Sequence, residues 1–214
     1  MPGYPIELEL RGKAVLVVGL GPVGRRKASG LAEAGARVVA VDPGALAVVE
    51  AHALEGVEVR PEAYRPEHLE GMSLVFAAAP AAVNRRVVAD AHRVGVLVGS
   101  ASEPGEGDFT VPAVWREGPL TLTVSTSGAS PALAVALRDR AARALGPAAS
   151  GLASLLAELR PEVLARLADP EARRRVMADW ADPRWIDLWQ AQGPAAVRLA
   201  LNERLDREAS RDGG

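Results

Sequence analysis

The sequence contains no cysteine, which excludes disulfide bonds, thiolate metal ligands and cysteine nucleophiles. Aromatic residues make up only 4% of the 214 residues, and Lys13 and Lys27 are the only lysines, so arginine carries nearly all of the positive charge. No apolar run approaches the length of a membrane span, and the net charge of -2 offers no strongly basic surface. We therefore expect neither a membrane protein nor a nucleic-acid-binding protein.

The location and the metal content of the protein are predicted from what else is missing. Residues 1–13 turn charged within a few positions and lack the apolar core of a secretory signal, which favours the cytoplasm. The three histidines, His52, His68 and His92, show no ligand spacing to one another, so we expect no metal site.

Strand-like and helix-like patterns alternate over the first half of the chain. Short apolar, β-branched runs typical of buried parallel strands lie at 13–18, 37–41, 57–59, 74–77 and 96–98. Helical patterns lie at 22–34, 46–54 and 83–94. Because such alternation forms right-handed crossovers, the fold class is predicted to be α/β, beginning with a Rossmann-type parallel-sheet domain.

The pattern changes after Ser100, where a loop rich in glycine, proline and acids begins. Residues 109–116 and 120–125 predict an antiparallel hairpin, and Ser130 is a suitable N-cap for the helix that follows. Only helical patterns follow, interrupted at 169–170, 182–183 and 193–194. We therefore predict three parts: a Rossmann domain at 1–112, a hairpin-plus-helix element at 113–146 and a small helical domain at 147–214.

The first predicted strand is followed by Gly19-Leu20-Gly21-Pro22-Val23-Gly24, a complete G-x-G-x-x-G motif. A buried strand before it and a helix after it are the context that a dinucleotide-binding loop requires. The first glycine permits a tight turn, the second lets the backbone approach a pyrophosphate, and the third lets the helix pack on the strand. The N-terminus of the helix adds N–H groups and partial positive charge. The motif therefore predicts a nicotinamide dinucleotide site.

Asp42 ends the second predicted strand, 18 residues after Gly24. An acid there can accept hydrogen bonds from the adenosine ribose and would repel the extra phosphate of NADP, so NAD is the expected cofactor. Pro43 follows it and is placed in the same predicted site. The alternative is a glycine turn in an unrelated α/β fold, with Asp42 capping the next helix.

Several segments, taken in order, carry a family resemblance. They are 5–10 with 12–13, 15–27, 83–87, 108–109 with 111–113, 118–120 and 124–134. In these segments the sequence resembles the precorrin-2 dehydrogenase family, the dehydrogenase and ferrochelatase module of siroheme synthesis. The similarity covers about residues 4–145, and the block at 124–134 is far more specific than a glycine motif.

The resemblance implies NAD-dependent oxidation of precorrin-2 to sirohydrochlorin, with insertion of ferrous iron in some members. It also implies a homodimer in which the middle element forms much of the interface. Ala78 stands in a turn that lies near the cofactor in such proteins, so it joins the predicted cofactor site. The substrate is then a tetrapyrrole rich in carboxylates.

Candidate catalytic residues lie in the loop after the fifth strand of the Rossmann domain. Members of the family usually carry an aspartate where this sequence has Ser102. Because serine cannot act as a carboxylate base, Glu103 or Asp108 in the same loop are predicted to substitute. A strong base is also dispensable if the conjugated product supplies the driving force.

Arginines and hydroxyls are candidates for binding the substrate carboxylates. Arg116 on the hairpin and Arg138 on the following helix are close in the chain to the serine-rich loop. That loop offers hydroxyls beside a helix N-terminus, on Ser125, Thr126, Ser127 and Ser130. The alternatives are ordinary surface arginines and simple capping by Ser130.

Two interpretations without catalysis stay open. A non-catalytic NAD-binding sensor accounts for the glycine motif and Asp42 but leaves the serine-rich loop unused. A tetrapyrrole-binding carrier that has lost catalysis is suggested by Ser102.

Overall fold

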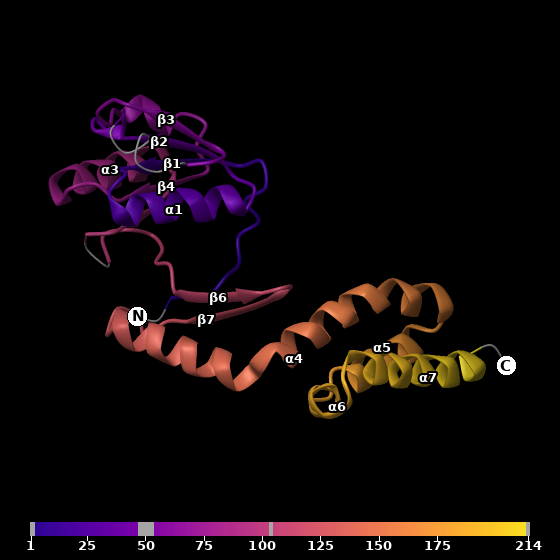
Figure 1. Ribbon diagram of the computed structural model, residues 1–214. Helices are drawn as coiled ribbons and strands as arrows, with labels where there is room; N and C mark the ends of the chain where they lie inside the picture. The colour runs from indigo at the N-terminus through magenta and orange to yellow at the C-terminus, as the bar shows by residue number, and fades with distance from the viewer. Residues whose placement is uncertain (1–2, 47–53, 103–104, 213–214) are drawn as a thin grey trace. The chain divides into compact units, whose positions relative to one another are not determined.

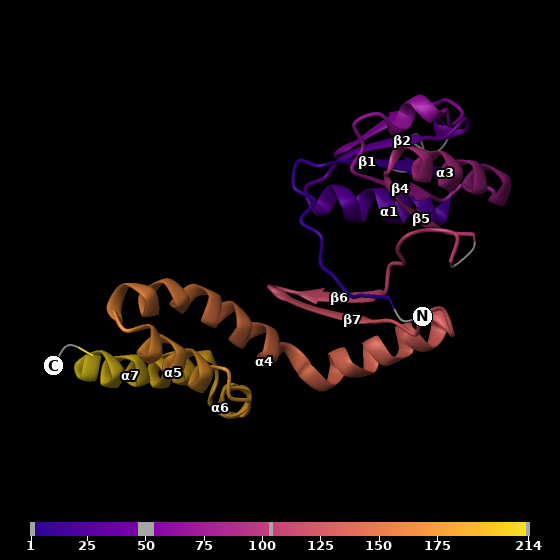
Figure 2. The same cartoon turned by 180° about the vertical axis from the view of Figure 1, so that it is seen from behind.

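The structure, a computed structural model, describes residues 3–46, 54–102 and 105–212. It divides into two units, residues 1–111 and 112–214, which Figures 1 and 2 show from opposite sides. Most of the predicted helix at 46–54, which includes His52, lies outside the described residues, as does the candidate Glu103. Within the described ranges, none of the helices combines the length and the apolar character needed to cross a membrane.

The first unit contains a five-stranded sheet in the order β3-β2-β1-β4-β5. Its strands are β1 (Ala14–Val18), β2 (Arg37–Val41), β3 (Val57–Arg60), β4 (Leu74–Ala77) and β5 (Leu97–Ser100). All four pairings are parallel, and the strand order reverses beside β1, between β1 and β4. This arrangement confirms the predicted Rossmann-type sheet, and in such sheets ligands bind outside the carboxyl ends of the strands at the reversal.

Helices α1 (Pro22–Glu33) and α3 (Ala81–Val94) cover opposite faces of this sheet. Because side chains alternate along a strand, Val17 packs in the core beneath α1, whereas Val18 packs in the core beneath α3. The core beneath α3 also includes Leu69 of the short 3-10 helix η1 (Pro66–Leu69). Packing on both faces fixes the carboxyl ends of β1 and β4 side by side.

The second unit begins with an antiparallel hairpin and continues as helices only. Its elements are β6 (Ala113–Glu117), β7 (Leu120–Val124), α4 (Pro131–Arg166), α5 (Pro170–Trp180), α6 (Arg184–Gln192) and α7 (Pro194–Asp212). The hairpin and all three predicted helix interruptions are present. The predicted start of the first hairpin strand at 109 is wrong, because Phe109 instead packs edge-on against Phe76 of the first unit, with ring centroids 5.2 Å apart.

Helix α4 bends at Gly146, whose φ of 64° and ψ of 175° are open only to glycine. Beyond the bend, the hydroxyl of Ser150 donates to the carbonyl oxygen of Glu117 at 3.0 Å, which ties the hairpin to the second half of α4. The hairpin and the helices therefore form one compact unit, and the predicted division between 113–146 and 147–214 stays a prediction.

The core of the second unit consists of apolar side chains from its four helices. Its most deeply buried members include Leu159, Val163, Val176, Trp180, Leu201 and Leu205. Each of the four helices contributes an apolar stripe to this core.

Candidate functional site

Two glycines of the loop between β1 and α1 are required by the fold itself. Gly19 has a φ of 95°, and a Cβ atom there would lie only 2.6 Å from the carbonyl oxygen of Ala78. Gly24 packs directly against the carbonyl group of Gly19 and leaves no room for a side chain. These contacts bring the first turn of α1 close to the ends of β1 and β4, as the motif predicts.

Gly21, the N-cap of α1, serves a different purpose. Its φ of -61° and ψ of 179° suit any residue, and a Cβ atom built there meets nothing within 4 Å. The first turn of α1 carries no acidic residue and no side-chain cap, and Pro22 stands at its start. The backbone at Val23 and Gly24 is thus not covered by a cap, and the residues present fit a bound pyrophosphate.

Asp42 lies at the end of β2 and holds the glycine loop in place. One carboxylate oxygen, Oδ2, accepts the N–H of Leu20 at 2.7 Å, and Oδ1 accepts the N–H of Gly44 at 2.7 Å. Asp42 therefore does cap the turn that contains Pro43. Because each carboxylate oxygen accepts more than one hydrogen bond, the same side chain can still receive a ribose hydroxyl.

Three cationic residues follow in the first two turns of α1. Arg25 donates to the carbonyl oxygen of Leu20 at 3.3 Å, and Arg26 is exposed. The ammonium of Lys27 lies 5.8 Å from the ring centroid of Phe76, and burial, followed by the charge of Arg26, lowers its pKa. Positive charge near a helix N-terminus opposes the helix dipole, so an anion bound at the loop would relieve this arrangement.

The loop after β4 runs beside the glycine loop and is connected to the loop after β5. The N–H of Ala78 donates to the carbonyl oxygen of Val18 at 2.8 Å. The N–H of Ala79 donates to Oδ1 of Asn84 at 2.9 Å, and Nδ2 of Asn84 donates to Oγ of Ser102 at 3.1 Å. The structure thus brings the predicted Ala78 and Ser102 to the same edge of the sheet.

Asn84 is a site residue that was not predicted from the sequence, and it is completely buried, with 0% exposure. Its two hydrogen-bond partners lie 5 and 18 residues away, in different loops. One sequence feature could have indicated it: an asparagine near the start of a helix, at a position on the buried face. A buried amide side chain needs hydrogen-bond partners.

Asp108 is held by contacts to the middle of β5. Its Oδ2 accepts the N–H of Val98 at 2.9 Å, its own N–H donates to the carbonyl oxygen of Val98 at 2.7 Å, and Oδ1 lies 3.1 Å from Nε2 of His92. These contacts anchor the loop after β5 at the strand, away from the end that carries Ser102. A role for Asp108 in catalysis stays a prediction.

The serine-rich loop before α4 is closed by its own hydroxyls. Ser130 accepts the N–H of Leu133 at 3.2 Å and is the predicted N-cap. Thr126 Oγ1 accepts the N–H of Ser130 at 3.1 Å, and Ser125 Oγ accepts the N–H of Ser127 at 3.2 Å. Ser127, with a φ of 50°, is exposed.

The two candidate arginines of the second unit differ in their surroundings. Arg116 on β6 is exposed. Arg138 on α4 forms an ion pair with Asp139 at 2.6 Å and donates to the carbonyl oxygen of Val114 at 3.3 Å, so it braces α4 against β6. Binding of a substrate carboxylate by either arginine stays a prediction.

The parallel sheet, the strand reversal and the glycine loop together define a dinucleotide-binding α/β protein. Residues 6–113 match a family described as "Putative NAD(P)-binding", and residues 117–143 match one described as "Sirohaem biosynthesis protein central". The chain belongs to the family described as NAD(P)-binding, and the second match, together with it, confirms the resemblance found in the sequence. The prediction of a nicotinamide dinucleotide site is confirmed with it.

Two relatives, both named siroheme synthase, support the assignment to this family. Siroheme synthase of Methylococcus capsulatus is 36% identical over 210 residues, covering 96% of this chain and 42% of the relative. Siroheme synthase of Chromobacterium violaceum is 36% identical over 208 residues, covering 96% and 44%. The chain thus spans less than half the length of these curated relatives. The solved structure "SirC, precorrin-2 dehydrogenase" has the same fold, with a TM-score of 0.73, 23% identity and coverage of 96% and 100%.

Proposed function

We propose that this chain oxidises precorrin-2 to sirohydrochlorin with NAD as the hydride acceptor. The observation that carries the proposal is the open, uncapped backbone at Gly21, at the start of α1 and at the point where the strand order reverses. The names of the relatives and of the structural neighbour support the choice of substrate. Bound NAD supplies the hydride-accepting chemistry, and the protein's own residues bind its phosphates and fix its orientation.

NAD rather than NADP is the proposed cofactor because of Asp42. Its carboxylate stands at the end of β2, where a Rossmann site receives the adenosine ribose. Both oxygens are fixed by backbone N–H groups, so the negative charge cannot turn away from an added 2′-phosphate. In a titration followed by cofactor fluorescence, NADH should bind more tightly than NADPH, and equal binding would contradict this choice.

The proposed substrate contacts lie in the second unit. Its loop at 125–130 presents the exposed Ser127 beside the N-terminus of α4, and Arg116 adds an exposed guanidinium on β6. Both group types bind carboxylates, which the tetrapyrrole carries around its ring. Replacement of Arg116 by methionine should raise the KM for precorrin-2 and leave the affinity for NADH unchanged.

We further propose a cytoplasmic homodimer that forms through the second unit. The first half of α4 exposes Leu133, Val135 and Leu137, at 50%, 42% and 42% of their surface, and the hairpin of β6 and β7 is a sheet of only two strands. Exposed apolar side chains and open strand edges favour association with a second copy. Sedimentation velocity should show a dimer that Leu137→Glu converts to a folded monomer, and a monomeric wild type would contradict the proposal.

Oxidation is tested by anaerobic incubation of the chain with precorrin-2 and either NAD or NADP. We expect sirohydrochlorin to form with NAD and only slowly with NADP. Binding of NADH without any oxidation of precorrin-2 would favour the sensor or the carrier instead.

A further inference from the structure

Asn84 connects the two loops that form the carboxyl edge of the sheet next to the glycine loop. Its Oδ1 accepts the N–H of Ala79 at 2.9 Å, in the loop after β4, and its Nδ2 donates to Oγ of Ser102 at 3.1 Å, in the loop after β5. The side chain is completely buried, whereas Ser102 is exposed. A buried amide with both ends engaged has one orientation, so it fixes the position of the exposed hydroxyl.

The direction of these hydrogen bonds limits what Ser102 can do. A serine hydroxyl has one donor and two acceptor sites, and Asn84 occupies one acceptor site. The hydroxyl of Ser100 lies 3.2 Å from that of Ser102 and can occupy the other. Either hydroxyl can be the donor of this contact. In the arrangement in which Ser100 donates, both acceptor sites of Ser102 are filled, and its proton is free for another acceptor.

The place of Ser102 matches this role. In the sheet register Ser100, at the end of β5, pairs with Ala77, at the end of β4. Ala78, the residue that follows Ala77, lies against Gly19 of the dinucleotide loop. The hydroxyl therefore stands along the edge where a ligand held by the glycine loop continues across β4.

We propose that Asn84 is a positioning residue that makes Ser102 a hydrogen-bond donor to a carbonyl-type oxygen of a bound ligand. The inference builds on the proposed function, which offers two such oxygens: the carboxamide of the nicotinamide ring and a carboxylate of the tetrapyrrole. In this arrangement Ser102 is not a proton acceptor, and its contribution is to orient a ligand.

Two substitutions separate the parts of this arrangement. Ser102→Ala removes the donor but also leaves Nδ2 of the buried Asn84 without this partner, so a modest loss of stability is expected and thermal unfolding checks that the variant is folded. Asn84→Asp keeps an oxygen for the N–H of Ala79 but offers Ser102 a second oxygen in place of the amide donor, so the proton of Ser102 turns inward. Ser102→Thr keeps the hydroxyl and tests rescue, and Ser29→Ala, on α1 of the same unit, is the control for loss of a hydroxyl.

The readout is the dissociation constant of three probes: NAD, ADP-ribose, which lacks the nicotinamide, and uroporphyrin, a stable tetrapyrrole carboxylate. If the acceptor is the carboxamide, Ser102→Ala and Asn84→Asp both weaken NAD by roughly two- to tenfold and leave ADP-ribose unchanged. If it is a substrate carboxylate, both weaken uroporphyrin by a similar factor and leave NAD unchanged. Ser102→Thr and Ser29→Ala should bind all three probes like the wild type.

The coupling between the two residues is the decisive result. Because Asn84 acts through Ser102, adding Asn84→Asp to Ser102→Ala should weaken binding no further. Additive losses in the double variant would overturn the inference, as would wild-type affinity of Ser102→Ala for every probe. A wild-type chain that shows the coupling but does not oxidise precorrin-2 would contradict the proposed function and leave this inference standing.

Discussion

At Gly21 a single added side chain should separate cofactor binding from folding. Gly21→Val places three carbon atoms where the structure has open space and where the backbone conformation suits any residue. We expect an unchanged melting temperature and a Kd for NADH raised roughly tenfold or more, because the backbone can no longer approach the pyrophosphate.

Gly24→Ala is the matched comparison for Gly21→Val. The new methyl group has no room beside the carbonyl group of Gly19, so this variant should lose roughly 1–3 kcal/mol of stability by overpacking. Thermal unfolding and NADH fluorescence distinguish the two variants. A Gly21→Val protein that binds NADH normally would remove the glycine loop from the cofactor site.

Asp42→Asn should relax the choice between the two nicotinamide cofactors. The amide keeps an oxygen for the N–H of Leu20 but removes the charge that opposes a 2′-phosphate. Loss of a surface repulsion of about 1 kcal/mol should lower the ratio of the NADPH and NADH dissociation constants roughly fivefold. The ratio is measured by parallel fluorescence titrations, and an unchanged ratio would show that Asp42 serves only to hold the loop.

For single residues, the sequence predicts those that act within one local motif. It does not predict those whose role depends on partners far away in the chain. The glycines and Asp42 follow from a motif because each acts within one strand-turn-helix unit. Asn84 has no such pattern, since its partners belong to two other loops. Ser102 was predicted through the family resemblance, but its hydrogen-bond direction appears only when Asn84 is placed beside it.

Among the helices, the bend in α4 depends on one glycine. Gly146 has a backbone conformation that costs about 1–3 kcal/mol in other residues, so Gly146→Ala should lower the free energy of unfolding by about that amount. Gly30, inside α1 with no atom near its missing Cβ, is the control, and Gly30→Ala should raise stability by up to about 1 kcal/mol. Urea unfolding measures both, and equal effects would contradict the assigned conformation.

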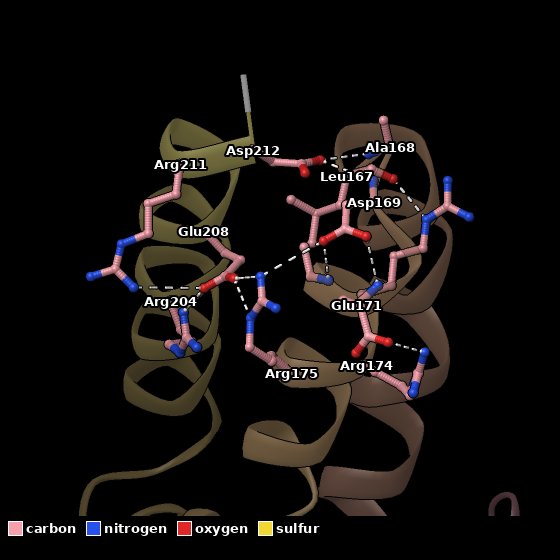
Figure 3. A network of polar contacts seen from close by, with 12 residues as sticks. Leu167, Ala168, Asp169, Glu171, Arg174, Arg175, Arg204, Glu208, Arg211 and Asp212 are labelled. Carbon is pink, nitrogen blue, oxygen red and sulfur yellow. Dashed lines mark hydrogen bonds and ion pairs between the residues drawn. The ribbon is translucent and has the colours of Figure 1, made fainter. Parts of the chain in front are cut away.

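An ion-pair network joins α5 to α7 around a buried carboxylate (Figure 3). The side chain of Glu208, with 2% exposure for the residue, accepts from Arg175 at 2.8 Å and from Arg204 at 2.9 Å. Close by, Oδ2 of Asp212 accepts the N–H of Ala168 at 2.7 Å. The end of α7 is thereby fastened to the segment that precedes α5.

This network should make the stability of the helical part sensitive to acid. Hydrogen bonds from Arg204 and then from Arg175 lower the pKa of Glu208 below its ordinary value of 4.5. A lowered pKa means that the stabilisation is fully present above pH 4.5 and is lost as the pH falls through the lower value of the folded state.

Glu208→Gln tests this pH dependence. The variant should be less stable than the wild type at neutral pH, and the difference should shrink in acid, because the wild type loses its ion pairs there. Melting temperatures measured from neutral pH to about pH 3, well below the usual range of a glutamate pKa, give the comparison. Parallel curves for the two proteins would contradict the sign.

Element boundaries that depend on tertiary contacts could not be predicted. Proline and glycine mark the three helix interruptions of the second unit, and these follow from the sequence. The late start of β6 could not be predicted from the sequence. Phe109 belongs to an apolar, strand-like run, but it packs against Phe76 and Gly99 in the first unit and does not join the hairpin.

For the whole molecule, the alternation of strands and helices was sufficient to predict the α/β class of the first unit. The order β3-β2-β1-β4-β5 follows from right-handed crossovers that start at a central strand. The second unit was predicted only as a hairpin and helices, because apolar helix faces do not specify which helices pack together. Its compactness comes from contacts such as Ser150 with Glu117 across the bend.

The central claim is that the first unit holds NAD for the oxidation of precorrin-2. The most direct test is an anaerobic reaction of the chain with precorrin-2 and NAD, in which NADH and sirohydrochlorin are followed in the same cuvette. We predict that the two appear in equal amounts with the wild type and that both form more slowly with Gly21→Val when NAD is not saturating. Formation of sirohydrochlorin without NADH, or binding of NAD without either product, would contradict the account.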